Sequence, residues 1–131
     1  MPHMQMLHAV DPATEILERL GDSLNDIELF HGQVILAVYL RPTKTKSGLI
    51  LTEDYVGDDK YQSKVGLLVK KGPEAFNDAS GQWFSGVDIK LHDWLFYRPA
   101  DGWGITVNDV LCRVFEDVSI KGRVAHPDAV Y

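Results

Sequence analysis

The sequence predicts a mainly β fold with one short amphipathic helix near its N-terminus. From residue 30 onward, short runs rich in β-branched and aromatic residues recur at near-regular spacing, separated by turn-forming residues. Before that point the apolar residues recur at helical spacing. With 131 residues, 45% of them hydrophobic, the chain can bury one core. A small barrel or sandwich is the expected architecture.

The helix is expected within residues 11–27, DPATEILERLGDSLNDI. Asp11 suits the N-cap, Pro12 suits the first helical position, and Glu15 brings a carboxylate into the first turn, where it favours the helix dipole. The sequence GDS at residues 21–23 can end this helix and begin a second turn. The segment is amphipathic and is expected to dock on another surface. We assign residues 1–28 to a helical N-terminal extension.

The expected strands follow in chain order. They are QVILAVYL, LILT, KVGLLVKK, QWF, VDIKL, WLFYR, GITV, VLCRVF and DVSIKGRV. Two long unpatterned stretches, residues 43–63 and 72–86, are of a length that is usually functional or mobile. The β domain is therefore assigned to residues 29–124, followed by a tail at residues 125–131. For the tail, a frayed end is the default for a terminus, and a small docking peptide is the alternative.

Composition argues against several classes of partner. The chain has 13 Lys+Arg against 19 Asp+Glu, a net charge of -6, which does not suit nucleic acid or an anionic membrane. Cys112, the only cysteine, permits no intramolecular disulfide and favours a reducing compartment, so a cytoplasmic location is expected. Its neighbours in VLCRVF indicate a small buried residue. The N-terminus has neither the signal-peptide pattern nor the length of a membrane span.

Catalytic patterns are not found in the sequence. The five histidines lack metal-ligand spacing, no serine stands in a GxSxG context, and DGWG lacks the spacing of a phosphate-binding loop. We therefore expect no enzyme activity, no metal site and no cofactor. Trp83 and Trp103 stand beside turn residues and are candidate recognition aromatics for a base or a sugar, whereas Trp94 alternates within a strand and is expected in the core.

Taken in order, the β region resembles the GroES-type co-chaperonins, small ring-forming subunits that cap a chaperonin chamber. The resemblance covers residues 30–124 and depends on the order of five motifs, none of which is specific alone: QVILAVYL before TKTKSGLIL, then KVGLLVKKG, IKLHDWLF, DGWG and NDVL. There are departures from the family. His92 replaces a glycine, the first strand lacks the family's charged alternation, and the two terminal extensions are additions.

The resemblance implies a site and a partner. Gly48, Leu49, Ile50 and Leu51 match the family's loop motif, so residues 43–63 would form a mobile loop. Its apolar triplet would dock on a chaperonin whose own nucleotide cycle controls binding. The chain would form a homo-oligomeric ring, and Trp103 would face the enclosed chamber. The interpretation of the triplet as a buried edge strand also stays open.

A second function remains open. The chain also suits a viral (phage) capsid decoration or assembly protein that reuses a GroES-like barrel. In that case the two terminal extensions would attach it to a capsid protein, and its location would be the virion.

Overall fold

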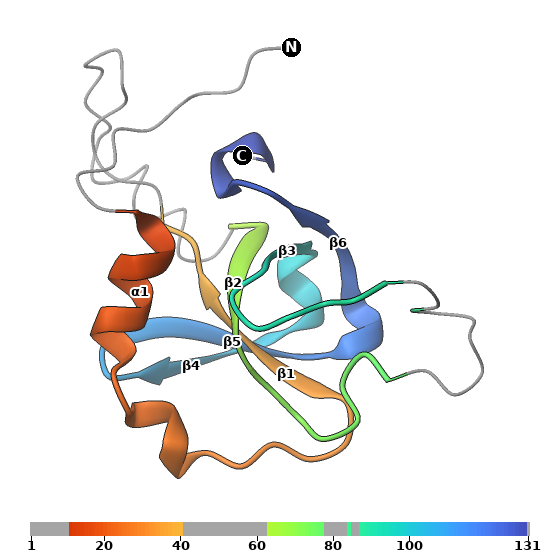
Figure 1. Ribbon diagram of the computed structural model, residues 1–131, viewed down its shortest axis with the longest axis horizontal. Helices are drawn as coiled ribbons and strands as arrows, with labels where there is room; N and C mark the ends of the chain where they lie inside the picture. Colours follow the sequence, from red (N-terminus) through yellow and green to blue (C-terminus); the bar gives the residue numbers. More distant parts are fainter. Residues whose placement is uncertain (1–10, 41–62, 78–83, 85–86, 131) are drawn as a thin grey trace.

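The computed structural model describes residues 11–40, 63–77, 84 and 87–130 (Figure 1). Six antiparallel strands form one sheet in the order β4-β5-β1-β2-β3-β6. Their bounds are β1 Gln33–Val38, β2 Val65–Lys71, β3 Trp94–Tyr97, β4 Trp103–Val107, β5 Val110–Glu116 and β6 Ile120–Val124. The helices are α1 Pro12–Leu20 and the 3-10 turns η1 Ser23–Asp26, η2 Pro99–Asp101, η3 Asp117–Ser119 and η4 Pro127–Val130. A mainly β fold with a short N-terminal helix is confirmed.

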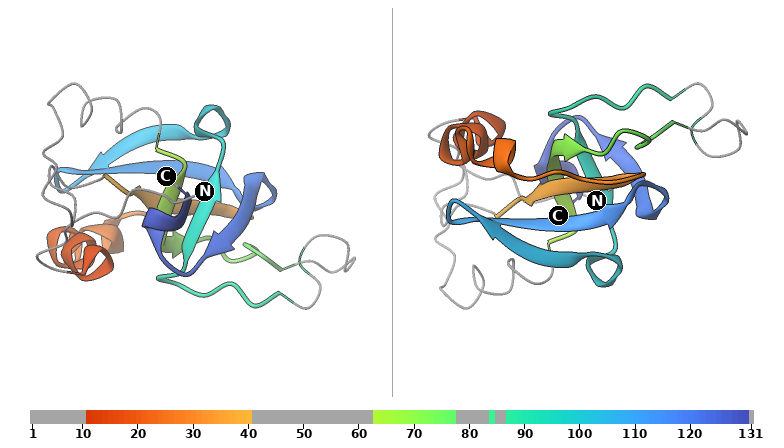
Figure 2. Two further views of the ribbon diagram at one scale, coloured as in Figure 1. Left: turned by 90° about the horizontal axis from the view of Figure 1, so that it is seen from above. Right: turned by 90° about the horizontal axis from the view of Figure 1, so that it is seen from below.

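The sheet is open, so the expected closure into a barrel is wrong. A barrel requires its two outermost strands to pair with each other, whereas β4 and β6 stand at opposite ends of the strand order in the described part of the chain. The chain path explains this. β4 and β5 form a tight hairpin at one edge, and η3 then carries the chain across to β3, where β6 pairs. Figure 2 shows the twist of the open sheet.

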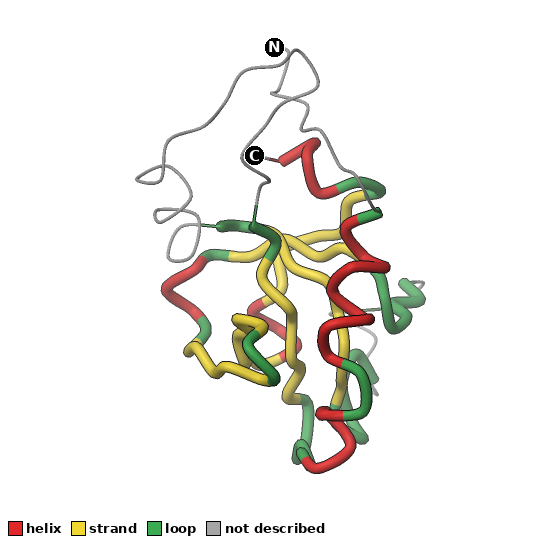
Figure 3. Tube along the Cα trace, turned by 90° about the vertical axis from the view of Figure 1, so that its left-hand side faces the viewer, coloured by secondary structure: helices red, strands yellow, loops and turns green. Residues whose placement is uncertain are grey.

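Local capping fixes the ends of α1. The Asp11 side chain accepts a hydrogen bond from the Thr14 amide at 3.2 Å, and Pro12 occupies the first turn. At the other end Gly21 has a φ of 51°, a left-handed conformation that glycine adopts without strain. Leu20 is fully buried against the sheet. The amphipathic helix therefore docks on its own chain, along one side of the strands (Figure 3).

The central strand β1 is buried on both faces. Ile35 and Ala37 join one apolar cluster, which α1 and the residues after it cover. Val34 and Leu36 join a second cluster with Phe115. Because successive strand residues point to opposite faces, the continuous apolar run of β1 needs cover on both sides. Figure 1 shows α1 on one flank and residues 73–77 and 87–90 extending from the other.

Most of the expected strands are confirmed. The expected strand VDIKL is not formed. Residues 87–90 form no strand, because the chain turns immediately after them. The Lys90 amide donates to the Asp93 carboxylate at 3.0 Å, the Asp93 amide donates to the Lys90 carbonyl at 3.2 Å, and His92 lies at a φ of 75°. LILT and QWF fall on segments that lie wholly or mainly outside the described residues.

The left-handed conformation of His92 gives a first stability prediction. His92→Gly is expected to raise the free energy of unfolding by up to about 1 kcal/mol, because a non-glycine residue in this conformation costs about 1–2 kcal/mol, partly offset by the greater chain entropy of glycine. Urea denaturation measures the change. Lys90→Gly, on the same exposed turn but without positive φ, is the control and should lower stability by about 0.5–1 kcal/mol. A loss of stability in both variants would contradict the argument.

Candidate functional site

The structure describes only part of the expected site. Gly48, Leu49, Ile50 and Leu51 lie outside the described residues, as does Trp83, so the choice between a docking loop and an edge strand stays a prediction. Trp103 is described and is 61% exposed at the start of β4. Trp94 is buried, as expected.

The apolar triplet belongs to the connection between two adjacent strands of the core. β1 and β2 pair antiparallel up to Val38 and Gly66, and the Tyr39 amide donates to the Val65 carbonyl at 3.0 Å. The Ser63 hydroxyl, which is buried, donates to the Tyr39 carbonyl at 2.7 Å. Adjacent antiparallel strands need only about 2–5 residues to connect them. Residues 40–64 are far more than the fold requires, which favours a function for this segment.

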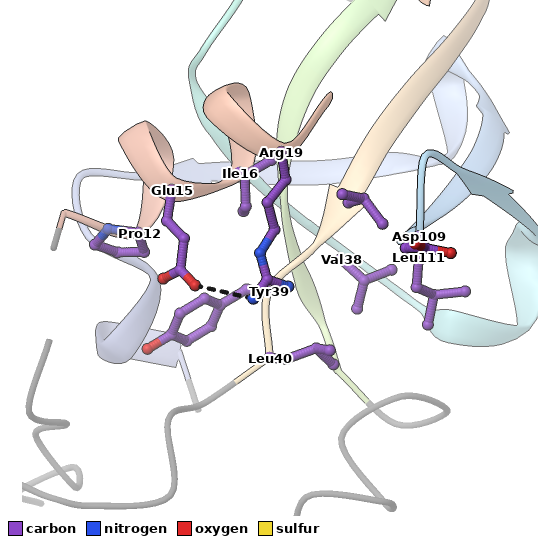
Figure 4. Close-up of a pocket in the computed structure, with 10 residues that line it drawn as sticks. Pro12, Glu15, Ile16, Arg19, Val38, Tyr39, Leu40, Asp109 and Leu111 are labelled. Carbon is purple, nitrogen blue, oxygen red and sulfur yellow. Dashed lines mark ion pairs between the residues drawn. The ribbon is translucent and has the colours of Figure 1, made fainter. Parts of the chain in front are cut away.

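A groove lies beside the base of this connection (Figure 4). Its volume is about 250 Å³, and three elements line it: α1, the end of β1 and the turn between β4 and β5. Apolar side chains of Ile16, Val38 and Leu40 form much of its wall. Glu15 and Arg19, one turn apart on α1, form an ion pair of 3.4 Å at the groove. The apolar wall of the groove suits an apolar side chain, and the Glu15–Arg19 pair gives the groove a polar rim.

The turn between β4 and β5 forms one wall of this groove. Asn108 and Asp109 have φ values of 48° and 64°, the left-handed pair of a tight two-residue hairpin, a conformation that asparagine and aspartate tolerate. The Asn108 side-chain amide also donates to the Arg19 carbonyl at the end of α1. This hydrogen bond joins the hairpin to the end of α1, beside the groove. Sequence patterns do not reveal it, because the two residues are 89 positions apart.

Close packing at Gly102, the residue before Trp103, restricts the backbone there. A Cβ on Gly102 would come within 2.5 Å of the Phe115 ring. In the preceding 3-10 turn, Arg98 donates to Asp101, with 2.7 Å between Nη2 and Oδ1. This hydrogen bond, together with the guanidinium charge, holds the pKa of Asp101 below its usual range. Trp103 is therefore presented to solvent next to a glycine that packs closely against the core.

The DGWG motif yields a second prediction with an internal control. Gly102→Ala should lower the free energy of unfolding by about 1–3 kcal/mol, because the new methyl group overlaps the buried Phe115 ring. Gly104→Ala meets nothing closer than 3.8 Å and should be nearly neutral. Thermal melts of both variants measure the difference. Equal stability of the two variants would show that the close packing is not a constraint.

The described residues offer no evident catalytic constellation. No three histidine, cysteine, aspartate or glutamate side chains gather there in a way that would hold a metal ion. Cys112 is fully buried, and burial raises the pKa of its thiol from 9.0 to about 12. A thiol in this state is not a nucleophile at neutral pH. No helix in the described ranges is long and apolar enough to cross a membrane.

The C-terminal tail is docked, which corrects the expectation of a frayed end. Pro127 and Asp128 are buried, and Val130 packs against the same cluster as α1. The Tyr39 hydroxyl donates a short hydrogen bond to the Asp128 carboxylate. No sequence pattern indicates this contact, because a single aspartate in the terminal sequence AHPDAVY would be expected to lie in solvent.

Comparison of the chain with protein-family models and with curated proteins finds no match.

Proposed function

We propose that this chain is a co-chaperonin-like ring protein, which binds and caps a chaperonin through the apolar triplet Leu49, Ile50 and Leu51 and so assists protein folding. The observation that carries the proposal is the order of the five GroES-type motifs along residues 30–124. Fold class alone would not support it, because small β folds serve many functions.

At three positions within the motifs, the surrounding structure or the backbone conformation favours glycine, and this supports the proposal. Gly72, which ends KVGLLVKKG, lies so close to the His31 carbonyl that a Cβ would approach it to 2.5 Å. Gly102 of DGWG faces the Phe115 ring. His92 has the left-handed backbone that a glycine at this place in the family would adopt freely. The resemblance thus extends to positions where the backbone limits the choice of residue.

The placement of the triplet also suits a docking segment. Along the chain it lies between two strands whose ends are joined by the hydrogen bond from the Tyr39 amide to the Val65 carbonyl. Its flanks, TKTKS and TEDY, are polar and charged. Each buried apolar side chain would contribute about 1.5–3 kcal/mol, before the entropy lost when the segment orders.

A ring turns weak single contacts into firm binding. Once one segment is docked, the others bind at high effective concentration, and avidity rises by roughly 10² to 10⁴. A modest change at each site then suffices for release. In this proposal that change comes from the nucleotide cycle of the chaperonin, which agrees with a chain that carries no recognisable nucleotide motif.

The described parts of the two extensions weigh against the capsid alternative. Attachment arms should be free to reach a capsid protein, whereas α1 and residues 127–130 both pack on their own chain. No specific observation favours a decoration protein, and we do not propose one.

Solution mass tests the ring. Native mass spectrometry or sedimentation should give a closed oligomer of the 14.7 kDa chain, and a heptamer would support the proposal. Dilution into the nanomolar range serves as a check that the oligomer is specific. A monomer at micromolar concentration would contradict the proposal.

A further inference from the structure

The outer edge of β4 is open to solvent. β4 lies at the end of the strand order, next to β5 (Figure 1), and none of the described residues pairs with its other side. Its sequence, WGITV, holds no charged residue and no proline, and its register with β5 is regular. Natural edge strands usually carry a lysine, a proline or a bulge, which keeps other strands from pairing with them. β4 has none of these features, so its edge can accept a further strand.

The backbone groups that point out from this edge belong to two residues. The turn to β5 holds two residues, so Val107 and Val110 on either side of it form a hydrogen-bonded pair. Hydrogen-bonded and non-hydrogen-bonded pairs alternate along an antiparallel ladder. Gly104 and Thr106, both exposed, therefore turn their amides and carbonyls away from β5.

We infer that the edge of β4 is a docking surface for a second copy of this chain, with the two β4 strands antiparallel around a two-fold axis. In the register centred on Ile105, Gly104 of each copy stands opposite Thr106 of the other, so the outward groups of both copies find partners. Ile105 then faces its own equivalent. Trp103 faces Val107 of the second copy, on the side of the sheet that carries the first apolar cluster.

Charge favours this edge and this partner. β6, the other edge of the sheet, carries Lys121 and Arg123, both exposed, so two β6 edges would bring like charges together. The β4 strands bring no charge of their own. Just before β4, the Asp101 carboxylate lies 2.7 Å from Arg98, so its charge is compensated where the second copy approaches. In a chain of net charge -6, this neutral edge is a place where two copies can meet without repulsion.

The pairing goes beyond the proposed function. A contact between like surfaces closes after two copies, whereas a ring needs contacts between unlike surfaces. The β4 edge therefore joins either two single chains or two rings in the same way. Because the contact is confined to a strand of five residues, it is smaller than a stable dimer needs, and the pairing depends on concentration.

Amide exchange at two protein concentrations tests the contact. The amides of Gly104 and Thr106 should exchange roughly fivefold slower or more at about 0.5 mM than at about 5 µM, because association protects them. The amides of Lys121 and Arg123, on the other edge, are the control and should exchange at the same rate at both concentrations. Rates at β4 that do not depend on concentration, or equal slowing at both edges, would overturn the inference.

Proline at position 106 tests the backbone groups. Thr106→Pro removes an outward amide and takes no ladder hydrogen bond from β5. At the higher concentration it should lower the mass measured by sedimentation toward half that of the wild type. Thr106→Val keeps the amide and should associate as the wild type does, while circular dichroism checks that both variants are folded. A folded Thr106→Pro with the mass of the associated wild type would overturn the inference.

Opposite charges at position 105 test the partner and the register. Ile105→Lys alone and Ile105→Glu alone should not associate, because like charges meet at the two-fold axis, whereas an equimolar mixture should associate. Folded variants that fail to associate when mixed would overturn the inference.

The same measurements separate this inference from the proposed function. A wild-type ring whose mass Thr106→Pro leaves unchanged would support the proposed function and reject the β4 contact. A wild-type pair of chains that Thr106→Pro separates would support the β4 contact and reject the ring.

Discussion

Under the proposed function, aspartate at positions 49 and 50 together is expected to abolish capture of a chaperonin by this chain. Leu49→Asp with Ile50→Asp removes two apolar side chains, each contributing about 1.5–3 kcal/mol, and would bring two charges into an apolar groove. In the proposed ring the loss would be repeated in every subunit, so the avidity would fall far more than for a single site. Pull-down with a chaperonin and ATP measures the loss, which should exceed about 100-fold.

The matched control places the same charges elsewhere. Val87 and Leu91 are 46% and 45% exposed, so Val87→Asp with Leu91→Asp adds two aspartates without entering the core. This control should bind as the wild type does. Unchanged binding of the variant at positions 49 and 50 would exclude the triplet as the docking element. Equal loss in both variants would point to net charge as the cause.

Truncation of Phe115 is expected to have the largest effect on stability. Phe115→Ala should lower the free energy of unfolding by about 3–5 kcal/mol, because the side chain is 2% exposed and its removal leaves a cavity. The ring lies 4.4 Å from the Tyr97 ring, centroid to centroid, and also supports Gly102 below the exposed Trp103. Urea denaturation at a fixed protein concentration measures the change, since association in the proposed ring would also contribute to apparent stability.

Phe30 provides the control for this substitution. It is 59% exposed, so Phe30→Ala removes the same atoms mainly from solvent and should change stability by less than about 1 kcal/mol. A small loss in Phe115→Ala would show that the second apolar cluster can collapse around the cavity. A loss of 3 kcal/mol or more in Phe30→Ala would show that the exposed face of residue 30 is covered in solution.

The parts of the fold that depend on neighbouring residues could be predicted from the sequence. The start of α1 follows from Asp11 and Pro12, and the β4–β5 turn follows from Asn108 and Asp109, because each signal acts within a few residues. The burial of Trp94 follows from strand alternation. VDIKL has the same alternation and is no strand, because Asp93 captures the Lys90 amide and turns the chain.

Features that depend on distant residues could not be predicted. The open sheet depends on which strand accepts β6, a choice between edges that no local pattern encodes. The hydrogen bond from the Tyr39 hydroxyl to the Asp128 carboxylate joins residues that are 89 positions apart. The groove in Figure 4 draws its wall from three separate segments. For the candidate site, the triplet and Trp103 could be selected from the sequence, while the hydrogen bonds that join Tyr39 to Ser63 and Val65 emerge only from the structure.

Nucleotide-dependent association with a chaperonin tests the proposed function most directly. The purified chain is mixed with a chaperonin, and native mass spectrometry is recorded without nucleotide, with ADP and with ATP. The proposed function predicts a complex of one ring with the chaperonin that forms with nucleotide and is lost without it. No complex under any of the three conditions, from a chain that is folded and oligomeric, would contradict it.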